Sequence, residues 1–428
     1  SRGLGDVYKR QSQRKDDDMK KAIFFVIMMV ASMFIAPTIY ALDNAVAKVG
    51  DVEYTTVQEA INNANGKTVT LVKDVTESVT VAKDSTVTLD LAGYTLTNKE
   101  GSHTVTNKGT LTITGNGTLD NVSHGKGALV NNGTATLVNG TLTRSKEAGT
   151  DPKTSGGNSW YVLDNNGGTF NMEGGKVLGT SGFSSAIRNL QATFNMKGGE
   201  IVNGFIALKN DDNGIINMTG GIITTENETG SAIQNWGQLA MTGGTLNAKS
   251  EGSKAIYTLS WDDKYNQVST VISDNAIING DVKIDYDRSY NPTKMPEFTV
   301  NGGTINGDIE DVVGGKITIT AGKVTGEVIG KGEVAIAKAD YTKINALIDK
   351  ANKLNKDLYT EESLKKLTVA INAVKYDKTI LEQDEVNKMA ADIESALAAL
   401  EEVKAANPDT ADINICLLYT SPSPRDTE

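Results

Sequence analysis

Carboxylate and indole side chains occur together at three points in the middle of the chain. The six residues are Asp211, Asp212, Trp236, Trp261, Asp262 and Asp263. Aromatic faces flanked by carboxylates suit stacking on sugar rings and recognition of sugar hydroxyls. Carboxylate oxygens also suit a weak Ca²⁺ site, and no other cofactor is expected. The alternative is that all six are ordinary loop residues, because polar loops are generally exposed.

A repeated segment must position these side chains. The segment TFNMEGGKV (169–177) recurs as TFNMKGGEI, IINMTGGII and QLAMTGGTL, and the four copies are 24, 22 and 23 residues apart. Such a period indicates a solenoid. Apolar and polar residues alternate within each copy, which predicts a strand whose Phe and Met side chains fill the interior. The glycine pair permits positive φ, so we expect the chain to turn there.

A second series consists of asparagines, each of which follows a short apolar stretch. Its members are Asn107, Asn131, Asn165, Asn189, Asn210 and Asn235. Asparagine tolerates the left-handed conformation and can offer its amide to the turns above and below, so we expect a ladder at one corner of the coil. The alternative is a row of ligand-binding amides.

The six candidate residues follow this corner. Asp211 comes directly after Asn210, Trp236 directly after Asn235, and Trp261 follows Thr258, which occupies the next corner. They should therefore lie on successive turns at one edge, about 4.8 Å apart per turn. The sequence predicts an acidic strip with indole faces along that edge.

A short helix precedes the first strands. Val57, Ala60, Ile61 and Ala64 recur at helical spacing, with Thr55 or Thr56 suited to the N-cap and Gly66 suited to the C-terminal turn. Alternating segments such as TVTLVKD follow it. We expect the helix to cover the apolar cross-section at the open end of the first turn.

These features resemble the right-handed parallel β-helix of the pectate-lyase-like superfamily, in its bacterial surface-protein or adhesin-like branch. The resemblance covers residues 46–337. It implies a mostly β fold, a right-handed parallel β-helix solenoid with an N-terminal capping helix. Activity does not follow from the resemblance, because many functions share this scaffold.

From Asp340 the apolar period changes from 2 to 3.6. The three apolar stripes are Ile344, Leu347, Ile348, Ala351 and Leu354; Leu364, Leu367, Ile371 and Val374; and Val386, Met389, Ile393, Leu397 and Leu400. They predict three helices of about 15 to 20 residues packed as a small bundle. Residues 340–404 are similar to the FIVAR module of bacterial extracellular and cell-wall proteins, which implies a stalk or an accessory binding unit at the cell surface.

The two ends of the chain look foreign to the fold. The DNA that can encode SRGLGDVYKRQ at the start reads, as its reverse complement, CLLYTSPSPR, which is found near the end. One element in both orientations resembles a transposase sequencing adapter. We therefore interpret residues 1–18 as an adapter-derived leader and 416–428 as an adapter-derived scar. The only cysteine lies in that scar, so the rest of the chain has no disulfide.

Between these ends lie two targeting signals. Residues 19–41 have the basic start and apolar run of a secretory signal peptide, with cleavage after Ala41 or at Ala45–Ala47. The alternative is a membrane anchor, although Pro37 shortens the apolar run below the roughly 20 residues that a spanning helix needs. Residues 407–415 include NPDTAD, which resembles a sortase signal except that Ala411 replaces the usual Gly. A proline-containing turn is the alternative.

The net charge of −11, from 53 acidic and 42 basic residues, argues against a nucleic-acid partner. Two functions remain. The first is a monomeric, non-catalytic surface protein, attached to peptidoglycan by sortase, that binds extracellular glycans or surface proteins. The second is a secreted polysaccharide lyase or glycoside hydrolase, which needs a base or paired carboxylates. Arg188 is a weak base candidate, and His103 and His124 do not combine with Asp211 and Asp212 in the chain order of related hydrolases. The first function is therefore favoured.

Overall fold

The computed structural model describes residue 19 and residues 44–64, 66–145, 160–179 and 184–404. The chain divides near residue 335 into two compact units. The signal peptide expected at 19–41, apart from Met19, the sorting signal at 407–415 and the adapter-derived segments at 1–18 and 416–428 lie outside the described residues.

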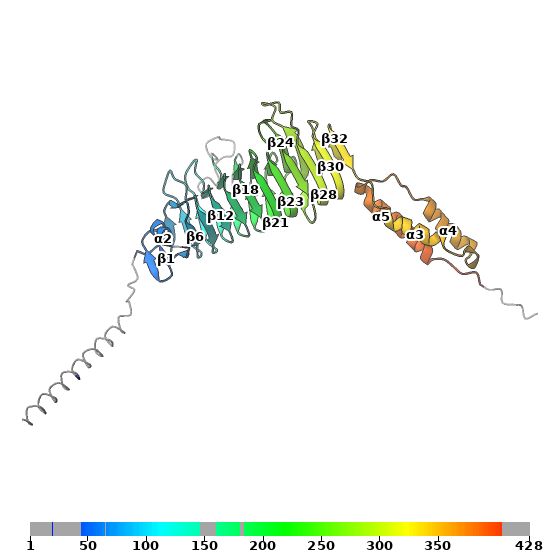
Figure 1. Ribbon diagram of the computed structural model, residues 1–428, viewed down its shortest axis with the longest axis horizontal. Coiled ribbons are helices and arrows are strands. Elements are labelled where there is room, and N and C mark those ends of the chain that lie inside the picture. Colours follow the sequence, from blue (N-terminus) through cyan, green and yellow to red (C-terminus); the bar gives the residue numbers. More distant parts are fainter. Residues whose placement is uncertain (1–18, 20–43, 65, 146–159, 180–183, 405–428) are drawn as a thin grey trace, which may run out of the picture. The chain divides into compact units, whose positions relative to one another are not determined.

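The first unit is a parallel β-solenoid, which confirms the mostly β fold expected from the repeats (Figure 1). Within the described residues, its strands form a sheet of 21 strands, here sheet A, and a sheet of 11 strands, here sheet B. A turn such as 105–120 contributes one strand to sheet B and two to sheet A. Strands of successive turns pair in parallel and in register, so that Phe170 lies opposite Phe194.

Sheet B comprises β5 (Val79–Val81), β8 (Val105–Asn107), β11 (Leu129–Asn131), β14 (Leu163–Asn166), β17 (Ser185–Leu190), β20 (Ile206–Asp211), β22 (Ser231–Asn235), β24 (Lys254–Ser260), β27 (Asp281–Tyr286), β29 (Ile309–Asp311) and β31 (Val328–Gly330). In sheet A, several of these turns each contribute two short strands. The first of the two is β3 (Thr68–Leu71), β6 (Thr86–Asp90), β9 (Thr110–Thr114), β12 (Thr134–Leu137), β15 (Thr169–Met172), β18 (Thr193–Met196) or β25 (Ser269–Ile272). The second member is β4 (Val75–Thr76), β7 (Thr95–Thr97), β10 (Thr118–Asp120), β13 (Thr141–Thr143), β16 (Lys176–Leu178), β19 (Glu200–Asn203) or β26 (Ile277–Asn279). Sheet A also contains β1 (Ala47–Val49), β2 (Val52–Tyr54), β21 (Ile215–Thr225), β23 (Gln238–Ala248), β28 (Glu297–Asn306), β30 (Lys316–Val324) and β32 (Glu333–Ile336).

The glycine pairs make the bend between the two sheet A strands of a turn, and each glycine has its own reason. The second glycine adopts the left-handed conformation, with φ of 85° at Gly199. The first packs against the preceding turn, where a Cβ on Gly198 would lie 2.6 Å from the carbonyl oxygen of Glu173. The sequence predicted the conformational role but not the close approach between turns.

The interior of the solenoid is filled by the apolar side chains of the repeat, as expected. Phe170 and Phe194 are fully buried and their rings stack with centroids 5.5 Å apart. Met172 and Met218 are equally buried. Each such side chain contributes roughly 1.5 to 3 kcal/mol through removal from water.

The six asparagines form a continuous ladder inside the coil. Each amide nitrogen donates to the amide oxygen of the next asparagine at 2.7 to 2.8 Å, from Asn107 to Asn235. All six side chains are fully buried, so none of the amides is accessible to a ligand. Their backbones lie in strands rather than in the left-handed region. The ladder therefore satisfies buried polar groups, and positive φ occurs instead just after the corner, at Asp212 and Asn213.

The N-terminal helix is α2 (Val57–Asn63), in which Val57 and Ala60 are fully buried. The side chain of Thr56 accepts from the amide of Glu59, as an N-cap does. The helix packs against β1 and β5, and β1 pairs antiparallel with β2 and β3. Since Ala47 lies inside β1, the alternative cleavage site at Ala45–Ala47 falls within the folded unit.

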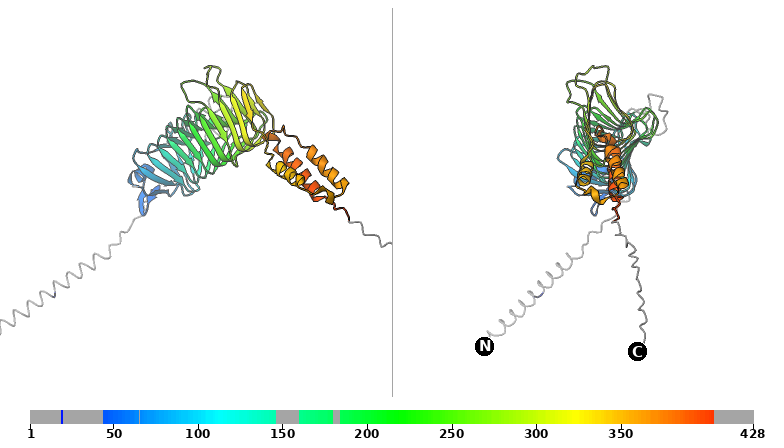
Figure 2. Two further views of the ribbon diagram at one scale, coloured as in Figure 1. Left: turned by 45° about the vertical axis from the view of Figure 1, so that its right-hand side comes forward. Right: turned by 90° about the vertical axis from the view of Figure 1, so that its right-hand side faces the viewer.

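The described part of the second unit contains three helices, α3 (Thr342–Asn352), α4 (Glu361–Asn372) and α5 (Gln383–Ala398), and the short 3₁₀ turns η2 (Lys356–Leu358) and η3 (Ile380–Glu382) (Figure 2). The predicted stripes face one another around buried Ile344, Leu367 and Ile393. The first two helices are shorter than predicted, because Asn355 and Thr360 accept backbone hydrogen bonds that start η2 and α4. No helix among the described residues is long and apolar enough to cross a membrane.

Candidate functional site

One column of polar side chains runs along the outer face of sheet B. Its members occupy the same register position on adjacent strands: Asp164, Arg188, Lys209, Gln234, Tyr257, Lys283 and Glu310. Each precedes an inward-facing corner residue, so alternation along the strand turns it outward. Apart from Arg188, sequence reasoning missed this column. The position just before each corner asparagine was the signal that could have found it.

All three tryptophans of the chain flank sheet B. Trp160 precedes β14, whereas Trp236 and Trp261 follow β22 and β24. The rings of Trp236 and Trp261 lie 5.7 Å apart, so the structure brings these two candidate residues together. Tyr265 stacks on Trp261 at 5.0 Å, and Tyr290 meets its ring edge-on at 4.7 Å. We call Trp236, Trp261, Tyr265 and Tyr290 the Trp261 cluster; its two tyrosines were not anticipated.

Lysine ammonium groups lie against the rings of this cluster. The Nζ of Lys209 is 4.9 Å from the centroid of Trp236. The Nζ of Lys264 is 5.2 Å from Trp261 and 4.8 Å from Tyr265. Cation–π attraction of this kind is worth about 0.5 to 1 kcal/mol at exposed sites. The lysines therefore hold the rings in place and add hydrogen-bond donors beside them.

The carboxylates near the cluster do not form the open acidic strip that the sequence predicts. Asp211 pairs with Lys209 at 3.1 Å, and Asp262 pairs with Lys264 at 3.0 Å. Asp263 accepts from the backbone amides of Thr293 and Lys294. Lys209 lies on the same strand as Asp211, and Lys264 lies in the same loop as Asp262. Thr293 and Lys294 belong to the neighbouring loop. Spacing along the chain did not reveal these pairings.

Hydrogen bonds lower the pKa values of two of these carboxyl groups. The backbone amide and side chain of Lys264 lower that of Asp262. The side chain of Thr293 and the amide of Lys294 lower that of Asp263. Both groups are consequently ionised and engaged with donors at neutral pH.

Asp212 differs from the other three carboxylates. Its Oδ2 accepts from the hydroxyl of Tyr265 at 3.1 Å, whereas its Oδ1 is shielded from solvent without a protein partner. Burial and the neighbouring charge of Asp211 raise the pKa of Asp212. Two adjacent carboxyl groups thus have different environments, one paired with a cation and one partly desolvated.

Two loops support the Trp261 cluster and are tied together. Asp263 in the loop after β24 binds Thr293 and Lys294, and the ammonium of Lys294 donates to the backbone oxygen of Tyr265 at 2.8 Å. The amide of Asn266 donates to the side chain of Asn213 at 2.7 Å. The cluster is therefore held from both sides, so little ordering is left for a ligand to impose.

Tyr257 and Lys283 of the column contact Asp285, which is almost fully buried in β27. It accepts from the hydroxyl of Tyr257 at 3.2 Å and forms ion pairs with Lys283 at 3.4 Å and Arg288 at 3.1 Å. Burial, together with the charge of Asp285, raises the pKa of Tyr257 to about 12. Tyr257 is thus a neutral hydrogen-bonding group at physiological pH.

Residues considered for catalysis or metal binding have structural partners. Arg188 donates to Asp164 through Nε and Nη2, both at 2.9 Å. Burial alone would lower the pKa of Arg188, but the hydrogen bonds and charge of Asp164 raise it overall, so it is not a base. His124 lies in a turn after β10, and His103 accepts from the amide of Gly127 at 2.9 Å. Among the described residues, no three His, Cys, Asp or Glu side chains are grouped to hold a metal ion, and the expected Ca²⁺ site stays a prediction.

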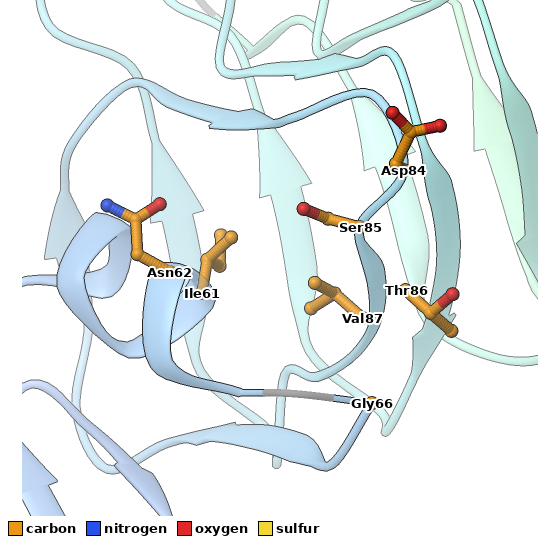
Figure 3. A pocket seen from close by; sticks show the side chains of 7 residues that line it. All are labelled: Ile61, Asn62, Gly66, Asp84, Ser85, Thr86 and Val87. Atoms are coloured by element: carbon orange, nitrogen blue, oxygen red, sulfur yellow. The ribbon is translucent and has the colours of Figure 1, made fainter.

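A hollow of about 380 Å³ lies elsewhere, between α2 and the turn before β6 (Figure 3). Its lining residues are Ile61, Asn62, Gly66, Asp84, Ser85, Thr86 and Val87. Asp84 is the single charged residue among them. With no aromatic ring and no ion pair in its lining, this hollow is less suited to a specific polar ligand than the sheet B face.

Comparisons of the chain with protein-family models, with curated proteins and with solved structures give no match.

Proposed function

We propose that the chain is a secreted bacterial surface protein whose sheet B face binds extracellular glycans. The observation that carries this proposal is the Trp261 cluster, in which four aromatic side chains gather beside the polar outward column of sheet B. Sugar rings present apolar faces that stack on aromatic rings, and hydroxyl groups that bind polar side chains.

The electrostatics of the face favour binding over catalysis. Asp211, Asp262 and Asp263 are occupied by cations or backbone amides, so they are less available as an acid and a base. Lys209 and Lys264 keep ammonium groups beside the rings and can donate to sugar hydroxyls. Recognition needs no exact geometry between two carboxylates, whereas glycoside hydrolysis does.

The cellular context of this proposal comes from the sequence motifs. The signal-peptide-like segment implies secretion, and the sorting-signal-like segment implies attachment to peptidoglycan by sortase. The helical unit resembles a FIVAR module and would act as a stalk or accessory binding unit. On this proposal the protein works as a monomer, without a cofactor, and its partners are glycans or the surface proteins that carry them.

Two exposed tyrosines provide a matched test of the site. Tyr290 belongs to the Trp261 cluster, whereas Tyr94 lies between β6 and β7 of sheet A, and both are exposed. We expect a glycan array to give reproducible hits, and Tyr290→Ala to weaken the affinity for a hit at least tenfold, about 1.4 kcal/mol. Tyr94→Ala should bind like the unchanged protein, as measured by isothermal titration calorimetry. An equal loss of affinity in both variants, or no loss of affinity in either, would place the binding site elsewhere.

A secreted glycoside hydrolase or polysaccharide lyase is the second candidate, favoured by the different environments of Asp211 and Asp212. A partly desolvated carboxyl group beside an ion-paired one resembles a general acid beside a base. The test is incubation with polysaccharides and detection of new reducing or unsaturated ends. We expect none. Release that disappears in Asp212→Asn would establish catalysis and overturn the binding-only function.

A further inference from the structure

We infer that the sheet B face binds an uncharged glycan as an extended chain, which also contacts a second aromatic cluster at the opposite edge of the sheet. This inference rests on the proposed glycan-binding function. The second cluster consists of Trp160, Tyr161, Asp164 and Arg188, and we call it the Trp160 cluster. It lies outside the six residues that the sequence singled out.

The Trp160 cluster is an ordered arrangement of rings and charge. The guanidinium of Arg188 lies 4.8 Å from the centroid of Tyr161 and 5.8 Å from that of Trp160. Its Nε and Nη2 bind Asp164, so one edge of the guanidinium is used by the ion pair. A guanidinium has five N–H donors, and those on the other edges can reach a ligand that stacks on the neighbouring rings.

The position of Trp160 is fixed by neighbouring turns. Its backbone oxygen accepts from Nη1 of Arg144 and from the hydroxyl of Ser184. Its ring also lies 5.9 Å from the imidazole of His103, which precedes β8. A half-buried tryptophan held in this way presents a preformed surface, so binding to it costs little ordering of the side chain.

The two clusters lie at opposite ends of the sheet B strands, the Trp160 cluster at the N-terminal ends and the Trp261 cluster at the C-terminal ends. Trp160 and Tyr161 come before β14 begins, whereas the Trp261 cluster follows the ends of β22, β24 and β27. The column residues Lys209, Gln234 and Tyr257 lie between them on adjacent strands. From β14 to β27 there are five strand spacings, which span about 24 Å. The nearest rings of the two clusters, at β14 and β22, are three spacings apart, about 14 Å. A disaccharide is therefore too short to contact both clusters, and a longer chain is needed.

The charges along this path favour an uncharged chain. Each cation of the column has a carboxylate partner on the face: Arg188 with Asp164 at 2.9 Å, Lys209 with Asp211 at 3.1 Å, and Lys283 with Asp285 at 3.4 Å. A polyanionic glycan would have to break these pairs or lie against the carboxylates. Neutral hydroxyl groups can bind the same donors and acceptors without that electrostatic cost.

The test is the dependence of affinity on chain length and on charge. Oligomers of two to eight β-1,4-linked glucose, mannose or xylose units, and uronate oligomers of the same lengths, are titrated calorimetrically into the full chain. We expect affinity for one neutral series to rise by at least tenfold between the dimer and the hexamer and then to level off. Uronate oligomers should bind more weakly than neutral ones of equal length.

Variants separate the two clusters. Tyr161→Ala should weaken hexamer binding at least tenfold and leave dimer binding unchanged, whereas Tyr290→Ala should weaken both. Tyr161→Phe keeps the ring and should bind the hexamer normally, which controls for misfolding. Equal affinity for dimer and hexamer, a preference for uronates, or normal hexamer binding by Tyr161→Ala overturns the inference but leaves glycan binding intact. Absence of binding to every oligomer and to every glycan on the array overturns the proposed function itself.

Discussion

The asparagine ladder predicts a large loss of stability when Asn189 is replaced. Asn189 lies in the middle of the ladder and is fully buried. The amide nitrogen of Asn189 lies within hydrogen-bonding distance of the oxygens of Asn210 at 2.8 Å, Ala192 at 2.9 Å and Ile215 at 3.2 Å. Its amide oxygen accepts from Asn165 at 2.7 Å. Replacement by alanine therefore removes the acceptor that joins this turn to the preceding one and the donor that joins it to the following one.

The expected cost follows from these contacts. A typical hydrogen bond contributes about 1 kcal/mol net, and a buried group left without its partner costs about 1 to 3 kcal/mol. The amide oxygen of Asn210 would lose the ladder donor. Asn165 would lose one acceptor but keep its bond to the backbone oxygen of Thr193. We therefore expect Asn189→Ala to lower the free energy of unfolding of the β-solenoid by about 3 to 5 kcal/mol.

A second, exposed ladder supplies the control. Asn217 donates to the amide oxygen of Asn195 at 2.9 Å, much as the buried asparagines do, but Asn217 is exposed. Water can replace the partner there, so Asn217→Ala should cost less than about 1 kcal/mol. Urea unfolding followed by tryptophan fluorescence measures both values, because all three tryptophans lie in the β-solenoid. If the two variants are equally stable, the buried ladder does not carry the stability assigned to it.

Two pH-dependent effects can be tested alongside. Folding raises the pKa of Asp212, so ionisation of this carboxyl group opposes folding. As pH falls through the raised pKa towards the ordinary value of 3.8, the free energy of unfolding of the unchanged protein should therefore rise relative to that of Asp212→Asn. Urea unfolding at each pH measures this difference. An equal pH response in the two proteins would contradict this assignment. In the helical unit, hydrogen bonding from Lys378 lowers the pKa of Glu382 to about 2. The stabilisation that ionised Glu382 gives is therefore complete above the ordinary pKa of 4.5, and it is lost as pH falls from 4.5 to about 2. Hydrogen exchange of α5 should show this loss in the unchanged protein and not in Glu382→Gln; an unaltered profile in the variant would argue against the ion pair.

Much of the fold was predictable from local pattern. Phe170 and Phe194 occur at the same position of two repeat copies, and they stack in the interior because parallel pairing in register places equal positions above one another. The apolar stripes around Ile344 and Ile393 likewise predicted the packing of the helical unit. The glycine pair was only half understood, because the approach of Gly198 to Glu173 joins residues 25 positions apart.

The candidate site was less predictable. Trp236 and Trp261 meet as expected, because they follow the corner closely on neighbouring turns, directly after Asn235 and three residues after Thr258. Tyr265 and Tyr290 belong to loops of irregular length, and no period indicates that their rings meet Trp261. The sequence also did not reveal that Asp263 holds a second loop through Thr293 and Lys294, which removes it from the predicted acidic strip.

One physical reason separates the features that the sequence determines from those that only the tertiary structure decides. The sequence by itself determined the repeat, the inward and outward alternation and the corner asparagines, because backbone geometry and hydrophobic burial act at every copy in the same way. Tertiary structure alone decided which carboxylates are paired, which rings touch and how Arg188, Lys209 and Tyr257 align on one face. Those contacts depend on the lengths and conformations of the loops, and they join residues from different turns whose separation along the chain varies.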